Sequence, residues 1–414
     1  MLEKSQNKKN LFYPSVIITL CALFLFYKYI LQVYPSIMTT ELMQEFQISG
    51  EGLGNLAATF FYTYMITQLF VGVLIDKFGT RLLGSIAILL SALGVYFFSQ
   101  SHTLLIAELS RALIGVGVAF ATVIYLKMTA VWFPPRYFAF IGGLLATAAM
   151  LGAVFGEAPL SLVVNNLGWR NSLFLCALIG FALAGTFALV VKSYPKNYMQ
   201  QKRIEHKTPI NWRDILSLLR SKPNWVLTLY SGLAFSPLAV FGGLWGNPFL
   251  QEAYHLTSTQ AASLASLTFI GLAIGGPVLG AIAERIDNKK QMMSYNALIT
   301  LVSITFAIYA PLSLWLLGVC LFIFGFSTGA FMLGFAIGKE INKPALAATV
   351  IALINTGDAI FGAVSEPLIG KFLDLGWDGT IVKNAHHFSV HNYHLAFLTL
   401  PIYLLIAWVL SLLI

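Results

Sequence analysis

The 414-residue chain is strongly apolar, since 58% of its residues are hydrophobic, 10% are charged and its mean hydropathy is +0.78. A water-soluble globule of this size needs far more polar surface, so the composition excludes a soluble protein. The formal net charge of +8 is the usual sign of a nucleic-acid or acidic partner. Here the basic residues follow the expected membrane boundaries, so no nucleic-acid partner is predicted.

Twelve apolar segments are long enough to cross a bilayer as helices, which takes roughly 20 residues each. The first is longer than the apolar part of a signal peptide and has no small-residue cleavage site after it, so we expect it to be retained. The sequence therefore predicts an all-α membrane protein with twelve transmembrane helices. The predicted spans are residues 11–38, 52–75, 82–100, 103–127, 137–164, 171–192, 223–246, 259–283, 291–310, 312–338, 345–372 and 393–413.

Lysine and arginine gather in alternate connections between these spans. By the positive-inside rule these connections are cytoplasmic, which predicts a multi-pass protein of the bacterial inner membrane with both termini in the cytoplasm. The basic residues in question are Lys4, Lys8, Lys9, Lys77, Arg81, Lys127, Arg136, Arg285, Lys289, Lys290, Lys339 and Lys343, together with those of residues 192–222.

The longest connection, residues 193–221, is basic and lies at the midpoint of the chain. It predicts a division into an N-terminal six-helix bundle (1–192), a cytoplasmic linker and a C-terminal six-helix bundle (222–414). Within the linker, Thr208-Pro209 resembles a helix start, so we expect a short amphipathic helix on the membrane face that contacts anionic lipid. Its apolar stripe would contain Ile210, Trp212, Ile215, Leu216 and Leu219.

The two predicted bundles are related by an internal repeat. A shift of 208 residues places 72–81 on 280–289, Pro159-Leu160 on Pro367-Leu368, and 167–169 on 375–377. Duplicated halves are typical of secondary transporters, whose solute sites lie between the halves.

The loop between the second and third spans carries the most specific motif, which contains Gly72, Asp76, Lys77, Gly79 and Arg81. It resembles the signature loop of the major facilitator superfamily, with Thr80 as a mild departure. The resemblance implies two pseudo-symmetric bundles and a cytoplasmic charge latch, to which the repeat adds Glu284 and Arg285. From the residues alone, Asp76 can cap a helix or pair with Arg81, and Gly79 permits a tight turn. The alternative is a turn that only sets the topology.

The fourth span contains Arg111, Gly115 and Gly117, which resemble the second motif of the superfamily. That resemblance implies a role for Arg111 in proton coupling. Glu108 lies three residues earlier, on the same helical face, and predicts an ion pair with Arg111. A purely structural pair that fixes helix packing is the alternative.

The fifth span contains Gly152, Gly156, Glu157 and Pro159. It resembles the glycine-rich antiporter motif of the superfamily, but Glu157 stands where a proline is expected, which favours uptake over drug efflux. The glycines also fit close helix packing. A carboxyl group in an apolar span is costly to ionise, so Glu157 is expected to exchange protons near neutral pH.

Lys28 interrupts the first span too far from its end to reach water, so we expect it to face a cavity. Lys28, Arg111 and Glu157 fall at similar predicted depths, which predicts one polar cluster in the N-terminal half. Two roles stay open for Lys28. It neutralises Glu157 or Glu108, or it receives an anionic group of the solute.

The eleventh span contributes Asn355, Asp358 and Glu366, which lie roughly on one helical face. They fit a proton relay or a site for a solute amine, and the alternative for Glu366 is that it only stabilises a helix break at Pro367. Further residues are predicted to line the cavity and bind the solute: Tyr62, Tyr64, Gln68, Tyr230, Trp245 and Asn247.

No metal site or cofactor is predicted. Cys21, Cys176 and Cys320 lie in apolar runs without a metal-binding or disulfide pattern, and are expected to pack in the interior. Four histidines precede the last span, where a metal site or pH sensor is the alternative to no role. They are His386, His387, His391 and His394.

Residues 27–38, 132–134 and 168–170 are similar to a branch of the superfamily that includes lysosomal dipeptide carriers and phagosomal nutrient transporters of intracellular bacteria. The resemblance implies proton-coupled import of an amino acid, dipeptide or nucleoside by alternating access, with the solute, protons and lipid as partners of a monomer. A siderophore transporter, a drug or metabolite exporter and a transporter-like sensor remain as alternatives. The sequence lacks the HExxH, GxSxG and phosphate-binding motifs of an enzyme.

Overall fold

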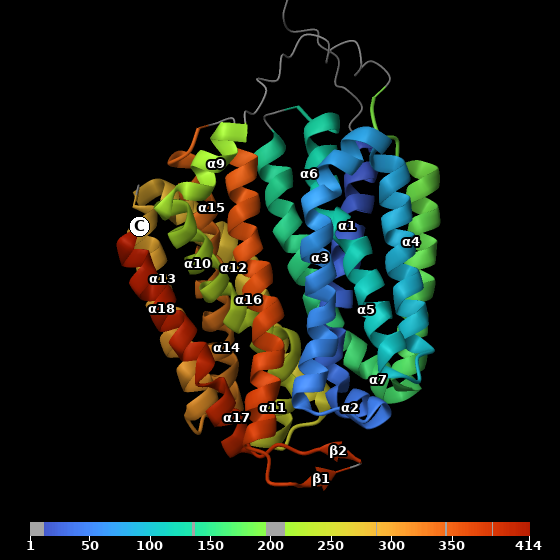
Figure 1. The fold of residues 1–414 in the computed structure, drawn as a ribbon, viewed down its shortest axis with the longest axis vertical. Coiled ribbons are helices and arrows are strands. Elements are labelled where there is room, and N and C mark those ends of the chain that lie inside the picture. Colours follow the sequence, from blue (N-terminus) through green and yellow to red (C-terminus); the bar gives the residue numbers. More distant parts are fainter. Residues whose placement is uncertain (1–11, 135–136, 196–211, 287, 344–345, 383) are drawn as a thin grey trace, which may run out of the picture.

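The computed structural model of the chain describes residues 12–134, 137–195, 212–286, 288–343, 346–382 and 384–414. These residues form a bundle of long, nearly parallel helices (Figure 1). The start of the predicted linker helix at Thr208-Pro209 lies outside the described residues.

Within its described residues, the N-terminal half contains one short 3-10 segment, η1, and seven α-helices. The longest of them, α7, holds two predicted spans. The elements are α1 (Phe12–Val33), η1 (Tyr34–Met38), α2 (Thr39–Phe46), α3 (Gly50–Phe78), α4 (Thr80–Ser99), α5 (Leu104–Val118), α6 (Phe120–Trp132) and α7 (Phe138–Val190).

Helix α7 reverses direction at Gly168, whose φ of 77° lies in the region that glycine adopts at little cost. Before the turn, α7 runs parallel to α1, since Gly152 lies against Phe26 and Gly156 against Ile30. After the turn it runs antiparallel, since the hydroxyls of Tyr27 and Tyr13 donate hydrogen bonds to the carbonyls of Cys176 and Val190, respectively. A Cβ atom at Gly152 would lie 2.2 Å from the Phe26 carbonyl oxygen, which confirms that this glycine permits close helix packing.

The C-terminal half is preceded by α9 (Trp212–Arg220), a short helix near the position of the predicted linker helix. The half ends in a two-stranded hairpin and two more helices. Its elements are α10 (Lys222–Val240), the π-helical turn η4 (Phe241–Trp245), α11 (Gly246–Tyr254), α12 (Ser258–Ile286), α13 (Lys289–Tyr309), α14 (Leu314–Thr328), the 3-10 turn η5 (Gly329–Met332), α15 (Leu333–Glu340), α16 (Ala347–Leu375), β1 (Ile381–Val382), β2 (Ala385–His386), α17 (Val390–Phe397) and α18 (Thr399–Leu413).

Ten helical segments of the described chain are long and apolar enough to cross a membrane. One of them is α7, which contains two spans. Helix α16 is 29 residues long, like α3, and lies within the span predicted at residues 345–372 for most of its length. The structure is therefore consistent with the twelve predicted spans.

The α-helical spans are interrupted at positions that are equivalent in the two halves. The 3-10 segment η1 follows α1, and the π-helical turn η4 follows α10 within one residue of the 208-residue shift. Likewise, α5 gives way to α6 at Ala119, and η5 interrupts α14 and α15 after Thr328. Discontinuous helices at equivalent positions of two halves are a feature of secondary transporters, where they surround the solute site.

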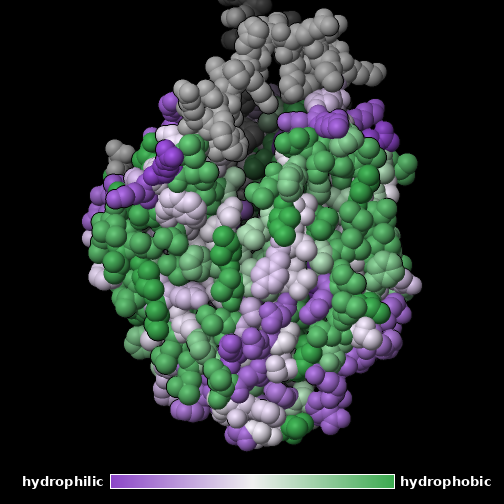
Figure 2. Space-filling view, viewed as in Figure 1, coloured by the Kyte–Doolittle hydropathy of each residue, from purple (hydrophilic) through white to green (hydrophobic). Residues whose placement is uncertain are grey.

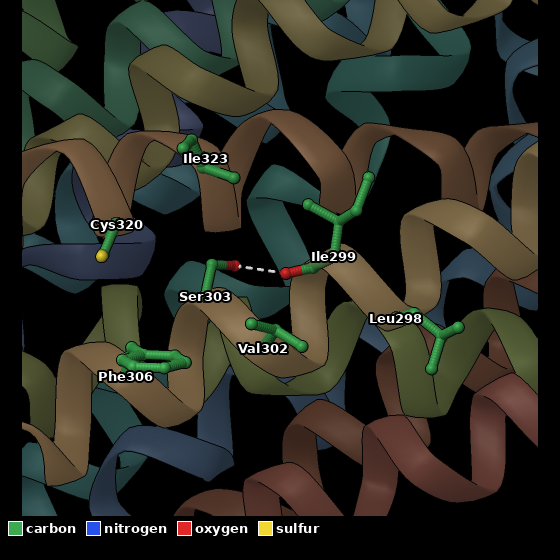
Figure 3. Close-up of a pocket in the computed structure, with 7 residues that line it drawn as sticks. All are labelled: Leu298, Ile299, Val302, Ser303, Phe306, Cys320 and Ile323. Carbon is green, nitrogen blue, oxygen red and sulfur yellow. Dashed lines mark hydrogen bonds between the residues drawn. The ribbon is translucent and has the colours of Figure 1, made fainter.

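On the face shown in Figure 2, the two flanks of the bundle are mostly apolar, and polar residues lie at the two ends and along the middle of the lower half. Helices α13 and α14 enclose a groove of about 350 Å3 on the outer surface of the bundle (Figure 3). Its lining residues Val302 and Phe306 are exposed and all but one of the groove residues are apolar or a cysteine. The groove therefore belongs to the lipid-facing surface rather than to a path between the halves.

We name the two ends of the bundle by their contents. The basic end carries Lys127, Arg220 and the C-terminal Ile414, whose carbonyl oxygen accepts a hydrogen bond from Lys290. The hairpin end carries β1 and β2. In Figure 1 the basic end is at the top and the hairpin end at the bottom.

The halves meet along two seams, α3 against α16 and α7 against α12. The α3 and α16 seam is tight at the hairpin end, and hydrogen bonds of Ser161 and Asn165 of α7 with Thr259 of α12 join the other seam there. A Cβ atom at Gly54 would lie 2.5 Å from Pro367 Cα, and one at Gly370 would lie 2.1 Å from the Gly50 carbonyl oxygen. Toward the basic end, the surface between the halves is hollowed (Figure 2). The structure thus shows a state that is closed at the hairpin end.

Candidate functional site

Lys28 lies in the middle of the molecule among aromatic side chains. Its side chain is 4% exposed, and its Nζ donates a hydrogen bond to the Tyr64 hydroxyl at 3.2 Å. Nζ also lies 4.5 Å from the centre of the Tyr64 ring and 4.9 Å from that of Tyr29. Within the described residues, Lys28 forms no salt bridge with a carboxylate. The ammonium is therefore stabilised by this hydrogen bond and by cation–π contacts with the two rings.

The position of Lys28 follows from the helical repeat of α1. Phe24, Lys28 and Leu31 are all buried and share one face of the helix. A side chain on this face, five residues before the end of α1, cannot place its ammonium group in water. Burial of a charge without a counter-ion is costly, so a lysine in this place is expected to serve a function.

Helix α16 supplies the opposite side of the same region. Asp358 is 8% exposed, and its Oδ1 accepts a hydrogen bond from the Ser231 hydroxyl of α10 at 2.6 Å. Asn355, one turn earlier, lies beside the Tyr64 hydroxyl, and Asp358 acts electrostatically on Tyr64. Lys28, Tyr29, Tyr64, Asn355 and Asp358 thus form one polar group with members from both halves, the Lys28 cluster.

Arg111 is buried elsewhere and is held by backbone groups. Its Nη1 donates to the Leu31 carbonyl and its Nη2 to the Ala57 carbonyl, both at 2.8 Å. The predicted ion pair with Glu108 is wrong, because the guanidinium turns inward to α1 and α3 while Glu108 stays half-buried on α5. The ring of Tyr34 lies 5.2 Å from the guanidinium carbon, and covers one side of it.

Glu157 is fully buried where α7 meets η1. Its Oε1 accepts a hydrogen bond from the Ser36 hydroxyl, and Asn247 of the other half lies beside the carboxyl group. The second oxygen, Oε2, has no hydrogen-bond partner of normal geometry among the described residues. This carboxyl group is therefore only partly satisfied.

The prediction that Lys28, Arg111 and Glu157 form one cluster is wrong, as is the prediction that Lys28 neutralises Glu157 or Glu108. The three charged groups have different partners. The reason is the path of the first span, in which Leu31 lies about one turn beyond Lys28 and Ser36 lies about two turns beyond it. Each charged group meets the span at a different level.

Glu366 lies in the α3 and α16 seam and is 3% exposed. Its Oε2 also lacks a partner among the described residues, and Arg111 lies within electrostatic range of it. The alternative role at a helix break is wrong, because α16 continues through Pro367 to Leu375. The Glu366 backbone carbonyl accepts a hydrogen bond from Trp245 Nε1 at 3.0 Å instead.

The other predicted cavity residues are distributed over both halves. The Tyr62 hydroxyl donates to the Ala363 carbonyl at 3.3 Å and thereby joins the halves, whereas Gln68 lies one turn from Tyr64 and its buried Oε1 has no partner in the described chain. Tyr230 is buried inside the C-terminal half. Asn247 accepts a hydrogen bond from Gln251 at 2.7 Å and donates to the Ser258 carbonyl at 3.3 Å.

At the basic end, Asp76 pairs with Lys127 at 2.7 Å. The predicted pair of Asp76 with Arg81 is wrong, because Arg81 Nε donates to the Ala188 carbonyl at 2.7 Å. Gly79 has a φ of 85°, which turns the chain from α3 into α4 and directs Arg81 toward α7.

The rest of the predicted latch has few contacts in this state. The Lys77 ammonium lies 5.2 Å from the Phe78 ring centre, and Gly72 faces open space. Glu284 and Arg285 are exposed at the end of α12.

The four histidines lie at the hairpin end or near it. The His386 ring stacks on Trp377 with ring centres 3.8 Å apart, and His387 Nε2 lies 2.9 Å from Glu252 Oε2. His391 is exposed, and the His394 backbone carbonyl accepts a hydrogen bond from Tyr309. No group of three or more potential metal ligands occurs within the described ranges.

Sequence reasoning missed several residues that complete these sites. Ser231 and Ser36 each bind a predicted carboxylate, and Tyr34 covers Arg111. Ser36 and Tyr34 lie in a stretch that the branch resemblance already emphasised. Asp374, which binds the start of α3, gave no signal because its partners are backbone groups 324 residues away.

Two pseudo-symmetric helical halves that enclose buried polar groups, closed at one end and hollowed toward the other, define a membrane transport protein. The chain belongs to the Major Facilitator Superfamily, whose family model matches residues 16–366 and, in a second match, 227–414. The chain is accordingly a multi-pass transporter and not an enzyme.

Curated relatives are transporters of small solutes. The probable L-galactonate transporter of Escherichia coli (strain K12) is 22% identical over 261 residues, which cover 60% of this chain and 57% of that protein. The probable sulfoacetate transporter SauU of Cupriavidus necator is 21% identical over 384 residues, 87% of each chain.

Solved structures share the fold. An inward-facing, occupied structure of a bacterial homolog of the human lysosomal transporter Spinster has a TM-score of 0.77 at 15% identity, and covers 97% of this chain and 96% of that one. The nucleoside transporter NupG has a TM-score of 0.74 at 14% identity, with 96% and 99% covered.

Proposed function

We propose that this transporter is a secondary carrier of the bacterial inner membrane that imports a small polar or zwitterionic nutrient together with protons. The observation that carries the proposal is the buried Lys28 ammonium, which has aromatic neighbours and no carboxylate partner in the described part of the chain. An anionic group of a solute is the partner that this cation lacks.

A carboxylate placed against Lys28 Nζ would also lie near the Tyr64 hydroxyl and Asn355. Charge-assisted hydrogen bonds of this kind are shorter and stronger than neutral ones. Asp358, on the opposite half, is suited to receive a solute amine. An amino acid or dipeptide would therefore bridge the halves, and a nucleoside would use the same hydroxyl and amide groups without the ion pairs.

The named substrates of two relatives support an anionic group in the solute. L-Galactonate and sulfoacetate both carry a carboxylate. A solute with a carboxylate alone would satisfy Lys28 and leave Asp358 to bind a proton. The cluster thus fits small acids as well as zwitterions, and the two classes differ in their demand on Asp358.

Proton coupling is assigned to the buried carboxyl groups of Glu157, Asp358 and Glu366, with Arg111 near Glu366. Each lies at a contact between halves or beside one, so a proton on it changes the free energy of that contact. A solute and a proton that both bind the same state better favour it together, which is the basis of symport.

The orientation of the protein in the membrane is inferred from the positive-inside rule. This rule predicts that the basic end faces the cytoplasm, so the structure corresponds to a state closed to the outside. In the opposite state the halves would close at the basic end, where the loop of Gly72, Asp76, Lys77, Gly79 and Arg81 is proposed to act as the latch.

The first test is thermal stabilisation of the detergent-purified protein, because a ligand that binds the folded state raises the apparent melting temperature. The panel pairs each amino acid with the amine that lacks its carboxylate, and adds dipeptides, nucleosides and sugar acids. Stabilisation by carboxylates and not by the matched amines is expected. Equal stabilisation by both members of each pair would contradict a Lys28 carboxylate site.

The second test is uptake of the ligand into proteoliposomes with an imposed pH gradient. Accumulation against the solute gradient, abolished by a protonophore, is expected of a proton symporter. Uptake that ignores the pH gradient would leave a uniporter and refute the coupling.

A further inference from the structure

At the hairpin end, the start of α3 is held by a carboxylate from the other half of the protein. Asp374 lies in the last turn of α16. Its Oδ1 accepts a hydrogen bond from the Gly50 amide at 2.8 Å, and its Oδ2 accepts one from the Glu51 amide at 2.7 Å. Both oxygens are thus directed at the N-terminus of one helix.

The first amides of a helix have no partner within the helix, and a negative charge there is favoured by the helix dipole. In α3, the Ser49 side chain accepts a hydrogen bond from Gly52 at 3.3 Å, so this third amide has a local cap. The Gly50 and Glu51 amides are bound by Asp374 instead. The N-terminus of α3 therefore depends on the other half for part of its capping.

The equivalent helix in the repeat, α12, is capped within its own sequence. The Thr257 side chain accepts a hydrogen bond from the Gln260 amide at 3.3 Å, and the Gln260 side chain accepts one from the Thr257 amide at 3.0 Å. This reciprocal arrangement is a capping box. The repeat aligns Gln260 with Gly52, which has no side chain to close such a box.

The second seam is held by uncharged groups. Asn165 of α7 donates a hydrogen bond to the Thr259 hydroxyl at 2.8 Å, and the hydroxyls of Ser161 and Ser258 lie 3.3 Å apart. One seam at the hairpin end thus has a charge-to-helix contact, and its counterpart has contacts between neutral side chains.

The surroundings of Asp374 fix its carboxylate in place. His386 Nδ1 lies 3.4 Å from Asp374 Oδ1, and the His386 ring is stacked on Trp377. The backbones at Gly50 and Gly370 approach so closely that a Cβ atom at Gly370 would lie 2.1 Å from the Gly50 oxygen. This contact cannot persist if the halves separate at the hairpin end.

We propose that Asp374 stabilises the closed state at the hairpin end, because its carboxylate caps α3 only while this end is closed. We call the contact of α3 with α16 at this end the hairpin-end gate. Opening of the hairpin end exchanges the carboxylate for water at the Gly50 and Glu51 amides, and closing restores it. The proposal rests on the alternating access proposed above, but not on the identity of the solute or on proton coupling.

The test measures how often the hairpin end opens in the purified full-length protein without solute. Ser161, fully buried in the second seam, is replaced by cysteine and labelled with a hydrophilic maleimide, and the protein with only its native cysteines gives the background. In this reporter protein, Asp374→Asn removes the charge while it keeps the shape. An increase of about tenfold in the labelling rate is expected, because a charged cap is lost.

Asp378→Asn is the matched control. Asp378 lies in the loop that follows α16, four residues after Asp374, and is exposed. It accepts a hydrogen bond from the Thr380 amide at 2.9 Å rather than from the other half. Its labelling rate is expected to equal that of the reporter protein. Asp374→Glu keeps the charge and alters the shape, so its rate is expected to stay within about threefold of the same reference.

A labelling rate unchanged by Asp374→Asn, or a larger increase for Asp374→Glu than for Asp374→Asn, would overturn the proposal, since the second pattern means that shape and not charge matters. If Asp374→Asn does not fold, Asp374→Glu alone decides. A labelling rate for Asp374→Glu close to that of the reporter protein supports a charged cap, and a rate well above it refutes this cap. If the protein fails the uptake tests above but shows the expected labelling rates, the proposed role of Asp374 stands and only the proposed proton coupling is refuted.

Discussion

Charged side chains have different surroundings in the Lys28 cluster, where Lys28 is buried, and at the hairpin end, where Asp374 is half-buried. In the centre, the Lys28 ammonium is left among tyrosines without a counter-ion from the described chain. At the hairpin end, the Asp374 carboxylate has two backbone amides and a histidine around it. Under the proposed function a solute completes the centre, whereas the contacts of Asp374 need no solute. Recognition and closure are assigned to separate groups of residues, and substitutions should separate them.

The largest expected effect is on recognition. Lys28→Met keeps the length of the side chain and removes its charge, so solute affinity should fall by about 10- to 100-fold, the range for loss of a hydrogen bond to a charged group. Thermal stabilisation by the solute measures the affinity, with the exposed Lys371→Met of α16 as the control. Without solute, Lys28→Met should melt no lower than the native protein, because it removes a buried charge. Undiminished affinity would place the solute elsewhere.

The next effect concerns coupling. Glu157→Gln replaces a buried carboxyl group that accepts a hydrogen bond from the Ser36 hydroxyl, near the end of the first span. Accumulation driven by a pH gradient should be lost, while exchange of labelled for unlabelled solute should persist, because exchange needs no net proton movement. Both are measured in proteoliposomes, with Asp378→Asn as the control. If Glu157→Gln still accumulates solute, Asp358 or Glu366 carries the proton instead.

A smaller effect is expected at the basic end. Asp76→Asn breaks the pair with Lys127, in which the aspartate side chain is 62% exposed. Such a pair is worth about 1 kcal/mol or less, so the melting temperature should fall by only about 2 °C. Cysteine labelling at position 161 in the Ser161→Cys reporter should not rise, since the pair lies within one half and away from the gate. A rise comparable to that of Asp374→Asn would show that the two ends are coupled through this pair.

The smallest expected effect comes from His386→Ala. The imidazole supports Asp374 at 3.4 Å but does not touch α3 in the described contacts. Its loss should raise the labelling rate by about twofold, well below the effect of losing the carboxylate. An effect as large as that of Asp374→Asn would assign the gate to the histidine as well.

The fold was predictable because the features that indicate it can be read directly from the sequence. Long apolar runs, the 208-residue offset and the loop from Gly72 to Arg81 required no knowledge of tertiary contacts. The breaks at η1 and η4 were not predicted as such, although Pro35 lies in the first and both obey the offset. A π-helical turn depends on packing rather than on a sequence pattern.

The site was only partly predictable. Lys28, Asp358 and Glu157 were evident as ionisable residues in apolar spans, but their partners were not. Arg111 binds backbone carbonyls of α1 and α3, which every residue possesses, so the sequence favoured Glu108 as its partner instead. Asp374 escaped notice for the same reason, because a helix N-terminus has no side-chain signature in a distant residue.

The contact of Gly50 with Gly370 also has a consequence for the passage of ions through the closed end. Two backbones that touch without side chains between them leave no room for a file of water molecules, so this seam can act as an electrical seal as well as a mechanical stop. A carrier whose closed state contains such a seal lets few protons leak across the membrane between turnovers. Bulk at either glycine would therefore be felt first as leakage of ions, before any loss of affinity for the solute.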